Sequence, residues 1–359
     1  MNFAKNWSLF SDYLKSQQAS DSARAAGEPP AEPVPEFLRD VAPAAPLAPA
    51  PGSMARTLRT VPALGSLDIP ERQPVLGDWF MEGDLGFIYA PRGLGKTWFA
   101  LGMATAITNG TAFGPWQAAA RRSILYVDGE MPCQALRARV SGMGAGEGFV
   151  VLNHEAYFHL EGGVLNFASP TAQHELTELL LAQGITIVFL DNLSCLFSGM
   201  KENDADDWES VLGWLLTLRR HRIAVVVVHH SGRNKETMRG TSRREDAAFW
   251  VIRLDETLRG EVSRKGTTFR SMFTKDRNSR TEQPNIEWTF HSSEDGSITI
   301  QTKPASSLDT FRQWVADGLT SAEDIAHEMG LTKGAISRLA KIGIEAGWLV
   351  KRGREYALR

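Results

Sequence analysis

The pattern of apolar and polar positions changes its period along the chain. Between residues 57 and 304, helical spacing of apolar residues alternates with short strand-like runs. The helical stretches are Thr97–Thr108, Thr171–Gln183 and Asp206–Arg220. The strand-like runs are Leu85–Tyr89, Ser123–Val127, Thr186–Leu190 and Ile223–Val228. The last three runs are almost continuously apolar, as in parallel strands covered on both faces. The segment therefore predicts an α/β domain with a mainly parallel central sheet.

Four further strand-like segments complete this region. They are Ala247–Leu254, Thr267–Thr274, Ile286–His291 and Ser297–Thr302. Their connections are short, which favours antiparallel hairpins, and we expect them to extend the sheet.

Residues 305–359 have the pattern of a small domain of their own. Helices are predicted over Leu308–Val315, Ser321–Met329 and Thr332–Ala346, with a short turn between the second and the third. That arrangement is typical of a helix-turn-helix. Two short strands follow, Trp348–Lys351 and Glu355–Leu358, and they predict a β-wing. The sequence thus predicts a winged helix-turn-helix domain.

The first 56 residues differ in composition from the rest. Phe3, Trp7, Phe10 and Leu14 recur at helical spacing, which predicts a short amphipathic helix within residues 1–20. Eight of the 17 prolines fall within residues 29–51, interleaved with alanines. Such a stretch cannot bury a core, so residues 21–56 are expected to form a disordered linker. The helix either docks on a protein partner or folds back on the chain's own core.

Composition narrows the class of protein only slightly. The chain is 43 % hydrophobic and 23 % charged, and its formal charge of −3 gives no general attraction to nucleic acid. It contains no apolar run of membrane-spanning length and no signal core near its first residue, so we expect a cytoplasmic protein. Cys133 and Cys195 have neither the number nor the spacing of a disulfide framework or a metal site, which indicates structural thiols.

A phosphate-binding loop lies between the first predicted strand and the first predicted helix. It reads Ala90, Pro91, Arg92, Gly93, Leu94, Gly95, Lys96 and Thr97. The two glycines allow backbone angles that direct several amides at phosphate oxygens. Lys96 supplies a charge for the β- and γ-phosphates, and Thr97 a hydroxyl for Mg²⁺. The motif predicts bound ATP and magnesium, with Trp98 also at the nucleotide.

Three other predicted strands end in groups that complete such a site. Asp191 follows Ile187–Leu190 and is expected to orient water on the magnesium ion held by Thr97. Hydrolysis also needs a base for the attacking water, and Glu130 is the first choice, with Asp128 a weaker one.

The fourth strand ends in two imidazoles. His229 and His230 follow Ala224–Val228, and an imidazole at a strand tip can sense the γ-phosphate. We assign this role to His230. The following loop is strongly basic, which favours a functional role for the pair. The alternative is that these histidines are structural.

Together these motifs resemble the RecA-like ATPases, and within them the RepA-like hexameric replicative helicases of plasmids and mobile elements. The resemblance covers residues 80–280 and includes APRGLGKT, YVDGEM, VFLDNLS, VVVVHHSGR, MRGTSRRED and FTKDR. It implies that Glu130 is the catalytic base and that the active site lies between subunits of a homohexamer.

In such rings a neighbouring subunit supplies a cation to the γ-phosphate. The resemblance places Arg277 in this role, with Lys275 beside it and Arg280 in reserve. RepA-like proteins carry their arginine just before a tryptophan, whereas this chain has Phe249 before Trp250.

Two sets of basic residues are predicted to contact DNA. The resemblance directs the loops after the magnesium strand and the histidine strand at a central channel. The first loop, Lys201–Asp207, is acidic, whereas the second is basic and suits single-stranded DNA. Its contacts are Arg233, Lys235, Arg239 and Arg243. In the winged helix, duplex contacts are expected from Lys333, Ser337, Arg338, Lys341, Arg352 and Arg354.

These features favour a DNA-dependent ATPase of a plasmid, phage or integrative element that forms a ring and drives strand separation or translocation. One alternative is a RecA-like accessory ATPase of repair or recombination that does not unwind DNA. Another is a regulator whose winged helix binds an operator while ATP switches assembly. Stimulation of ATP turnover by single-stranded DNA and strand displacement would distinguish the three.

Overall fold

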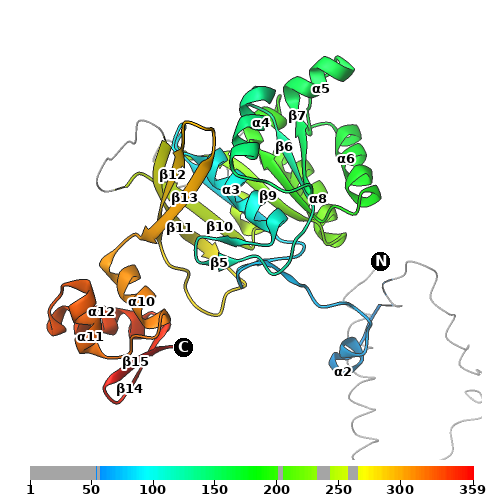
Figure 1. Ribbon diagram of the computed structural model, residues 1–359. Helices are drawn as coiled ribbons and strands as arrows, with labels where there is room; N and C mark the ends of the chain where they lie inside the picture. The colour runs from blue at the N-terminus through cyan, green and yellow to red at the C-terminus, as the bar shows by residue number, and fades with distance from the viewer. Residues whose placement is uncertain (1–53, 55–56, 201–204, 233–242, 258–265) are drawn as a thin grey trace, which may run out of the picture. The chain divides into compact units, whose positions relative to one another are not determined.

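The computed structural model describes residues 54, 57–200, 205–232, 243–257 and 266–359 of the chain (Figure 1). The chain divides into two units, residues 1–70 and 71–359. In the first unit, helix α2 (Val61–Gly65) begins after Thr60, whose side chain accepts a hydrogen bond from the Ala63 amide at 3.4 Å. The predicted helix within residues 1–20 lies outside the described residues, as does all of the predicted linker except Met54.

The second unit is built on a nine-stranded sheet with the order β13-β12-β11-β10-β3-β9-β8-β6-β7. The parallel strands are β10 (Trp250–Asp255), β3 (Leu85–Ala90), β9 (Ala224–His230), β8 (Ile187–Asp191), β6 (Ile124–Asp128) and β7 (Phe149–Asn153). Antiparallel strands β11 (Gly266–Asp276), β12 (Ile286–Ser292) and β13 (Ile298–Pro304) extend it. The predicted α/β fold with a mainly parallel central sheet is confirmed.

The strand order brings the predicted site together. Strand β3 lies between β9 and β10, and β8 lies between β9 and β6. All of these strands run in the same direction, so their carboxyl ends share one edge of the sheet. Ligands of open α/β sheets bind beyond this edge.

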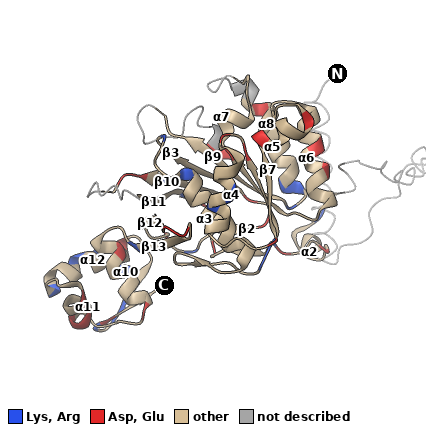
Figure 2. Cartoon of the chain, turned by 45° about the horizontal axis from the view of Figure 1, so that its top comes forward, with Lys and Arg blue, Asp and Glu red and all other residues tan. Residues whose placement is uncertain are grey.

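Helices cover both faces of the parallel strands (Figure 1). Helices α3 (Lys96–Asn109) and α4 (Cys133–Gly142) pack on one face, and α6 (Pro170–Ala182) and α8 (Ala205–Arg220) on the other. Most of α3 is buried, so it is apolar around its whole circumference. The shorter helices are α5 (His154–Glu161), α7 (Leu193–Leu196) and α9 (Arg243–Asp246). In Figure 2, red marks acidic residues on α5, α6 and α8.

An aromatic cluster fills the core between the sheet and two short hairpins. The hairpins are formed by β1 (Pro74–Leu76) with β2 (Phe80–Met81) and by β4 (Ala112–Phe113) with β5 (Trp116–Gln117). Trp79 packs edge to face on Trp250, with ring centroids 4.9 Å apart. A Cβ at Gly86 would lie 2.1 Å from the Trp250 ring, so only glycine lets that indole lie against β3.

The C-terminal segment has its own apolar core. It comprises α10 (Ser307–Ala316), α11 (Ala322–Met329), α12 (Lys333–Glu345) and a hairpin of β14 (Leu349–Arg352) and β15 (Glu355–Leu358). Ser306, Ser321 and Thr332 cap the three helices through their side chains. These helices and strands coincide, within about two residues, with those that the sequence predicts.

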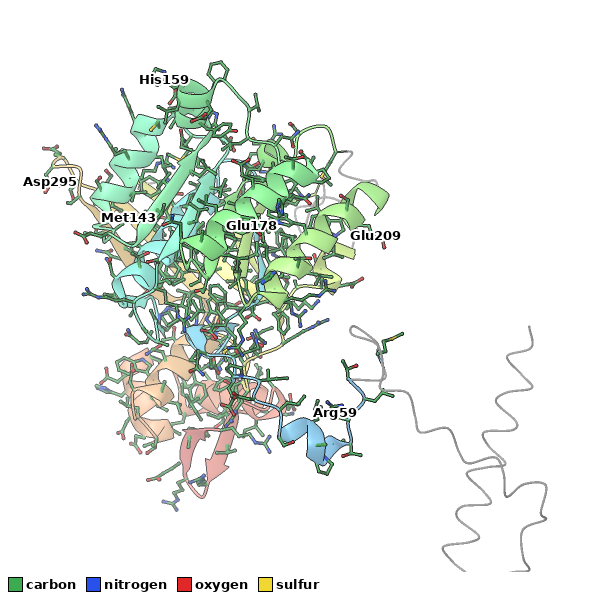
Figure 3. The ribbon with its side chains drawn as sticks, turned by 90° about the vertical axis from the view of Figure 1, so that its right-hand side faces the viewer. Arg59, Met143, His159, Glu178, Glu209 and Asp295 are labelled. Atoms are coloured by element: carbon green, nitrogen blue, oxygen red, sulfur yellow. The ribbon has the colours of Figure 1, made fainter. Side chains whose placement is uncertain are left out.

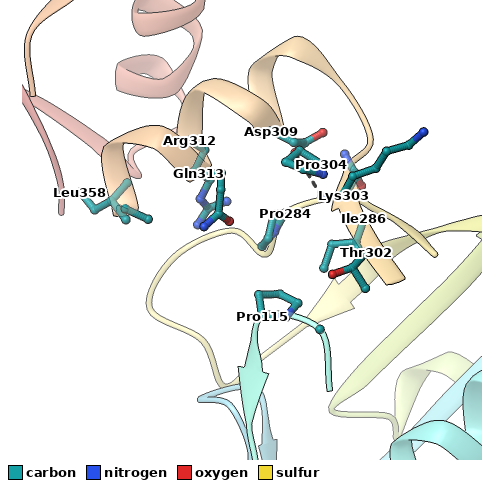
Figure 4. A pocket seen from close by; sticks show the side chains of 13 residues that line it. Pro115, Pro284, Ile286, Thr302, Lys303, Pro304, Asp309, Arg312, Gln313 and Leu358 are labelled. Carbon is teal, nitrogen blue, oxygen red and sulfur yellow. Dashed lines mark hydrogen bonds between the residues drawn. The ribbon is translucent and has the colours of Figure 1, made fainter. Parts of the chain in front are cut away.

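A pocket of about 440 Å³ lies between α10 and the ends of β12 and β13 (Figure 4). The Asn285 amide donates to Asp309 at 3.1 Å, and Arg312 donates to Thr281 at 3.3 Å. Burial lowers the pKa of Arg312, whose guanidinium lies 4.9 Å from the centre of the Trp348 ring. None of the predicted site residues lines this pocket.

Among the described residues, no helix is long and apolar enough to cross a membrane.

Candidate active site

The phosphate-binding loop has the backbone that its glycines suggest. It leaves β3 at Ala90 and enters α3 at Lys96. Gly93 and Gly95 have φ angles of 78° and 106°, which residues with a Cβ rarely adopt. A Cβ at Gly95 would also lie 2.6 Å from the Phe269 ring. Glycine is therefore needed at position 95 for both its backbone angle and its lack of volume.

Lys96 is folded back onto the loop. Its ammonium donates to the carbonyl oxygens of Ala90 and Pro91, at 3.2 and 2.9 Å. Burial lowers the pKa of Lys96 to about 8, while Asp191 and Glu130 oppose that shift. The side chain thus remains mainly charged at neutral pH and is available to exchange carbonyl partners for phosphate oxygens.

Asp191 and Thr97 form the pair expected to hold magnesium. Burial raises the pKa of Asp191 to about 6, although hydrogen bonds from Tyr126 and Thr97 lower it. The Tyr126 hydroxyl donates to Asp191 at 2.7 Å. Within the described part of the chain, no group of three or more acidic, histidine or cysteine side chains could hold a metal. One carboxylate and one hydroxyl suit Mg²⁺, which takes its other oxygen ligands from phosphates and water.

The two candidate bases, at the end of β6 and just after it, have different surroundings. Asp128 is buried and accepts hydrogen bonds from Asn153 at 2.7 Å and from the Glu130 and Met131 amides. Its carboxylate therefore holds the loop in shape, and Asp128 is not placed to activate water. Glu130 lies in the pocket and accepts a hydrogen bond from the buried Asn192 amide.

The two histidines at the end of β9 lie on different faces of the sheet. His230 pairs with Ala90 in the β3–β9 register and lines the same pocket as Lys96. His229 pairs with Tyr89 and is fully buried. Because side chains alternate along a strand, His230 is the member of the pair that can meet a phosphate.

These side chains surround a pocket of about 620 Å³, which is lined by residues of the loop, α4, β8 and β9. A family profile described as an AAA domain matches residues 53–236, just over half of the 359 residues. The chain belongs to the AAA domain family. The matched segment contains the loop, Glu130, Asp191 and His230, so the protein is a nucleotide-hydrolysing P-loop ATPase.

A solved structure is also similar to part of this chain. The flagellar accessory protein FlaH of Methanocaldococcus jannaschii is 12 % identical, with a TM-score of 0.42 over 61 % of this chain and 90 % of that one. No curated protein sequence matched the chain.

The pocket is also lined by residues that the sequence did not predict. Arg139 of α4 lines the pocket, and its guanidinium lies 4.6 Å from the centre of the Trp98 ring. Asn192 was also missed, although it directly follows Asp191. Cys195 lines the pocket as well, and burial raises its pKa, so its thiol stays neutral. Both cysteines are free.

Lys275 and Arg277 do not line the nucleotide pocket of the same chain. Trp250 pairs with Gly86 at the start of β3 and with Asp276 at the end of β11. This end of β11 therefore lies at the opposite edge of the sheet from the phosphate-binding loop. Lys275 donates to the carbonyl oxygens of Glu245 and Asp246, and Arg277 donates to Asp246 at 3.1 Å.

The predicted DNA contacts are described only in part. Arg233, Lys235 and Arg239 lie outside the described residues, and Arg243 is described only as part of α9. The C-terminal set is exposed, in α12 and in the β14–β15 hairpin: Lys333, Ser337, Arg338, Lys341, Arg352 and Arg354. Lys333 forms an ion pair with Glu323 at 2.8 Å, and Lys341 approaches Glu345 at 3.8 Å. Exposed pairs of this kind add little stability, so phosphates can replace them at small cost.

Proposed function

We propose that this protein is a RecA-like, DNA-dependent ATPase that forms a ring and drives strand separation or translocation along DNA, as a helicase or translocase. The observation that carries the proposal is the separation of two halves of a hydrolysis site. Lys96, Thr97, Glu130, Asp191 and His230 face one pocket at the carboxyl edge of the sheet. The cations Lys275 and Arg277 lie at the opposite edge.

This separation is what a ring of identical subunits requires. One edge of each subunit offers nucleotide, magnesium and base, and the opposite edge offers cations to the next subunit. A cation that arrives only on assembly makes hydrolysis depend on the neighbour. The closed symmetry of homo-oligomers accommodates such head-to-tail contacts as rings. A hexamer follows from the resemblance to RepA-like proteins.

Contact with DNA is proposed for the C-terminal segment. Three capped helices followed by a hairpin suit a winged helix, with α12 as the helix that enters the major groove. The exposed cations of α12 and the hairpin would contact phosphates. Docking of residues 1–20 on a protein partner stays a prediction.

Mixing two inactive variants tests the shared site. Lys96→Ala lacks a working phosphate loop but keeps Arg277, whereas Arg277→Ala keeps the loop but lacks the proposed trans cation. Each variant alone should lose most ATPase activity, and a mixture should recover part of it through interfaces that combine both intact halves. The exposed Lys303→Ala, on β13, is the matched control and should retain activity.

The outcomes separate the alternatives. Absence of recovery in mixed oligomers, or full activity of Arg277→Ala, would refute the shared site. Single-stranded DNA that stimulates ATP turnover and is accompanied by strand displacement supports a helicase. Stimulation without displacement favours an accessory ATPase of repair or recombination. Tight sequence-specific duplex binding with negligible turnover favours an ATP-switched regulator, the function to which the exposed basic α12 also points.

A further inference from the structure

A buried carboxylate lies at the end of β3 that is opposite to the phosphate-binding loop. Asp84 directly precedes β3 and is fully buried. It accepts hydrogen bonds from the Met81 amide at 2.8 Å and from the Asn278 side chain at 2.7 Å, and it forms an ion pair with Arg72. Burying a carboxylate is costly unless it is paired and hydrogen-bonded, as Asp84 is. Asp84 does not line the nucleotide pocket, so nucleotide binding does not account for it.

Asn278 connects this carboxylate to the proposed trans cation. It directly follows Arg277, and its side-chain amide donates to Asp84 and to the Trp79 carbonyl oxygen, each at 2.7 Å. Its backbone amide donates to Asp276 at 3.0 Å. Asn278 is therefore attached to the core by its side chain and to its own turn by its backbone. These contacts fix the chain on the carboxyl side of Arg277 relative to β3.

Phe249 fixes the chain on the amino side of Arg277. The Arg277 amide donates to the Phe249 carbonyl oxygen at 3.0 Å, and the Phe249 amide donates to the Leu85 carbonyl oxygen at 2.8 Å. The Arg72 guanidinium lies 4.7 Å from the centre of the Phe249 ring. Because Arg72 also forms the ion pair with Asp84, one carboxylate supports Arg277 from both sides.

Helix α8 brings a second guanidinium to the Phe249 ring. Figure 3 labels Glu209 near the start of α8, and Arg219 lies in the last turn of this helix. The chain passes through α8 from the carboxyl end of β8 to the amino end of β9, so this last turn lies at the amino edge of the sheet. The Arg219 guanidinium lies 4.5 Å from the centre of the Phe249 ring. Such contacts contribute about 0.5–1 kcal/mol at exposed sites, and they hold Phe249 from a second element.

We propose that Asp84 is a positioning residue for the cation that each subunit offers to its neighbour. Through Asn278 and Arg72 it fixes the backbone on both sides of Arg277, whose side chain is exposed. A displacement of about 1 Å can cost about a hundredfold in rate, so a cation that acts across an interface needs such a support. Burial raises the pKa of Asp84 to about 6, and at neutral pH the carboxylate is therefore mainly charged. This inference rests on the proposed shared active site.

Subunit mixing with the full-length protein tests the assignment. Asp84→Asn keeps the shape of the side chain and removes its charge. By calorimetry it should bind a non-hydrolysable ATP analogue with unchanged affinity, because its own pocket lies at the other edge of the sheet. Its ATP turnover should fall about tenfold. A mixture with Lys96→Ala should recover turnover, since Lys96→Ala keeps a supported Arg277. A mixture with Arg277→Ala should not, because both variants lack the same half of the site.

Two further variants separate positioning from folding. Asn278→Ala leaves the ion pair of Asp84 in place and should give the same pattern of binding, turnover and recovery. Glu82→Gln is the matched control, because Glu82 also lies between β2 and β3. It loses ion pairs to Arg122 at 2.7 Å and to Arg222 at 3.6 Å, yet it should retain turnover.

The outcomes distinguish this inference from the proposed function. Full turnover in either variant, weaker binding of the ATP analogue by Asn278→Ala, or no recovery on mixing with Lys96→Ala would overturn the positioning role. Recovery on mixing with Arg277→Ala would overturn it as well. If Asp84→Asn does not fold, Asn278→Ala decides. Absence of recovery in the mixture of Lys96→Ala with Arg277→Ala would instead refute the shared site itself.

Discussion

The hydroxyl of Tyr126 offers the sharpest test of the magnesium pair. Tyr126 is fully buried, and its ring stacks on Phe149 and Phe189, with centroids 5.9 and 5.7 Å away. Tyr126→Phe keeps this packing and removes one atom, the donor to Asp191 at 2.7 Å. Asp191 then loses one of the hydrogen bonds that stabilise its charged form.

The expected size follows from that hydrogen bond. A hydrogen bond to a charged group contributes about 1.5–3 kcal/mol, and one pKa unit corresponds to about 1.36 kcal/mol. The pKa of Asp191, already raised to about 6, should therefore rise by a further one to two units. A neutral carboxyl group holds magnesium poorly, so both Mg²⁺ dependence and turnover near neutral pH should suffer.

The assay is the pH profile of kcat/KM for MgATP, which reports groups of the free enzyme. In Tyr126→Phe, the acidic limb should move to higher pH by about one to two units, and more Mg²⁺ should be needed at pH 7. Tyr157→Phe, on α5, is the matched control and should leave the profile in place. A folded Tyr126→Phe protein with an unmoved acidic limb and unchanged Mg²⁺ dependence would refute the reasoning.

Two further substitutions test the site without the chain's partners. Asp191→Asn should abolish ATPase activity yet raise the melting temperature at pH 8. The pKa of the Asp191 carboxyl group is raised from 3.8 to about 6, so the folded protein binds more protons than the unfolded chain between these two pH values. The free energy of unfolding of the unsubstituted protein therefore falls as the pH rises from 3.8 to 6, by at most about 3 kcal/mol. A lower melting temperature at pH 8 would contradict this. Gly95→Ala should lose nucleotide binding, because Gly95 has a φ of 106° and the added Cβ would lie 2.6 Å from the Phe269 ring. Gly213→Ala, in α8, is the matched control, since nothing lies within 4 Å of the added Cβ. It should keep nucleotide binding and gain up to about 1 kcal/mol of stability. Calorimetry with ATP analogue and thermal unfolding check both, and retained binding in Gly95→Ala would contradict the steric argument.

Where the sequence prediction failed, the segments are only half buried. Strand β7 was not predicted, because it forms the edge of the sheet and both Val150 and Val151 remain more than 40 % exposed. Helix α4 was also missed, since Leu136 is its one fully buried side chain among those described. An apolar pattern develops only where a segment buries one face or two, and these segments bury little.

The sequence by itself determined what depends on neighbouring residues. The glycines between Ala90 and Thr97 predict the backbone of the phosphate-binding loop. Continuous apolar runs predict the buried strands, and capping residues predict the C-terminal helices. These signals act within a few residues, through allowed backbone angles and local hydrogen bonds.

The tertiary structure alone decided which of these residues meet. It made Asp128 a support and left Glu130 in the pocket, it buried His229 and placed His230 at the pocket, and it set Arg139 on Trp98. It also placed Lys275 and Arg277 at the far edge of the sheet. The physical reason is that strand order, register and side-chain partners are set by packing between segments distant in the chain, which no local period encodes.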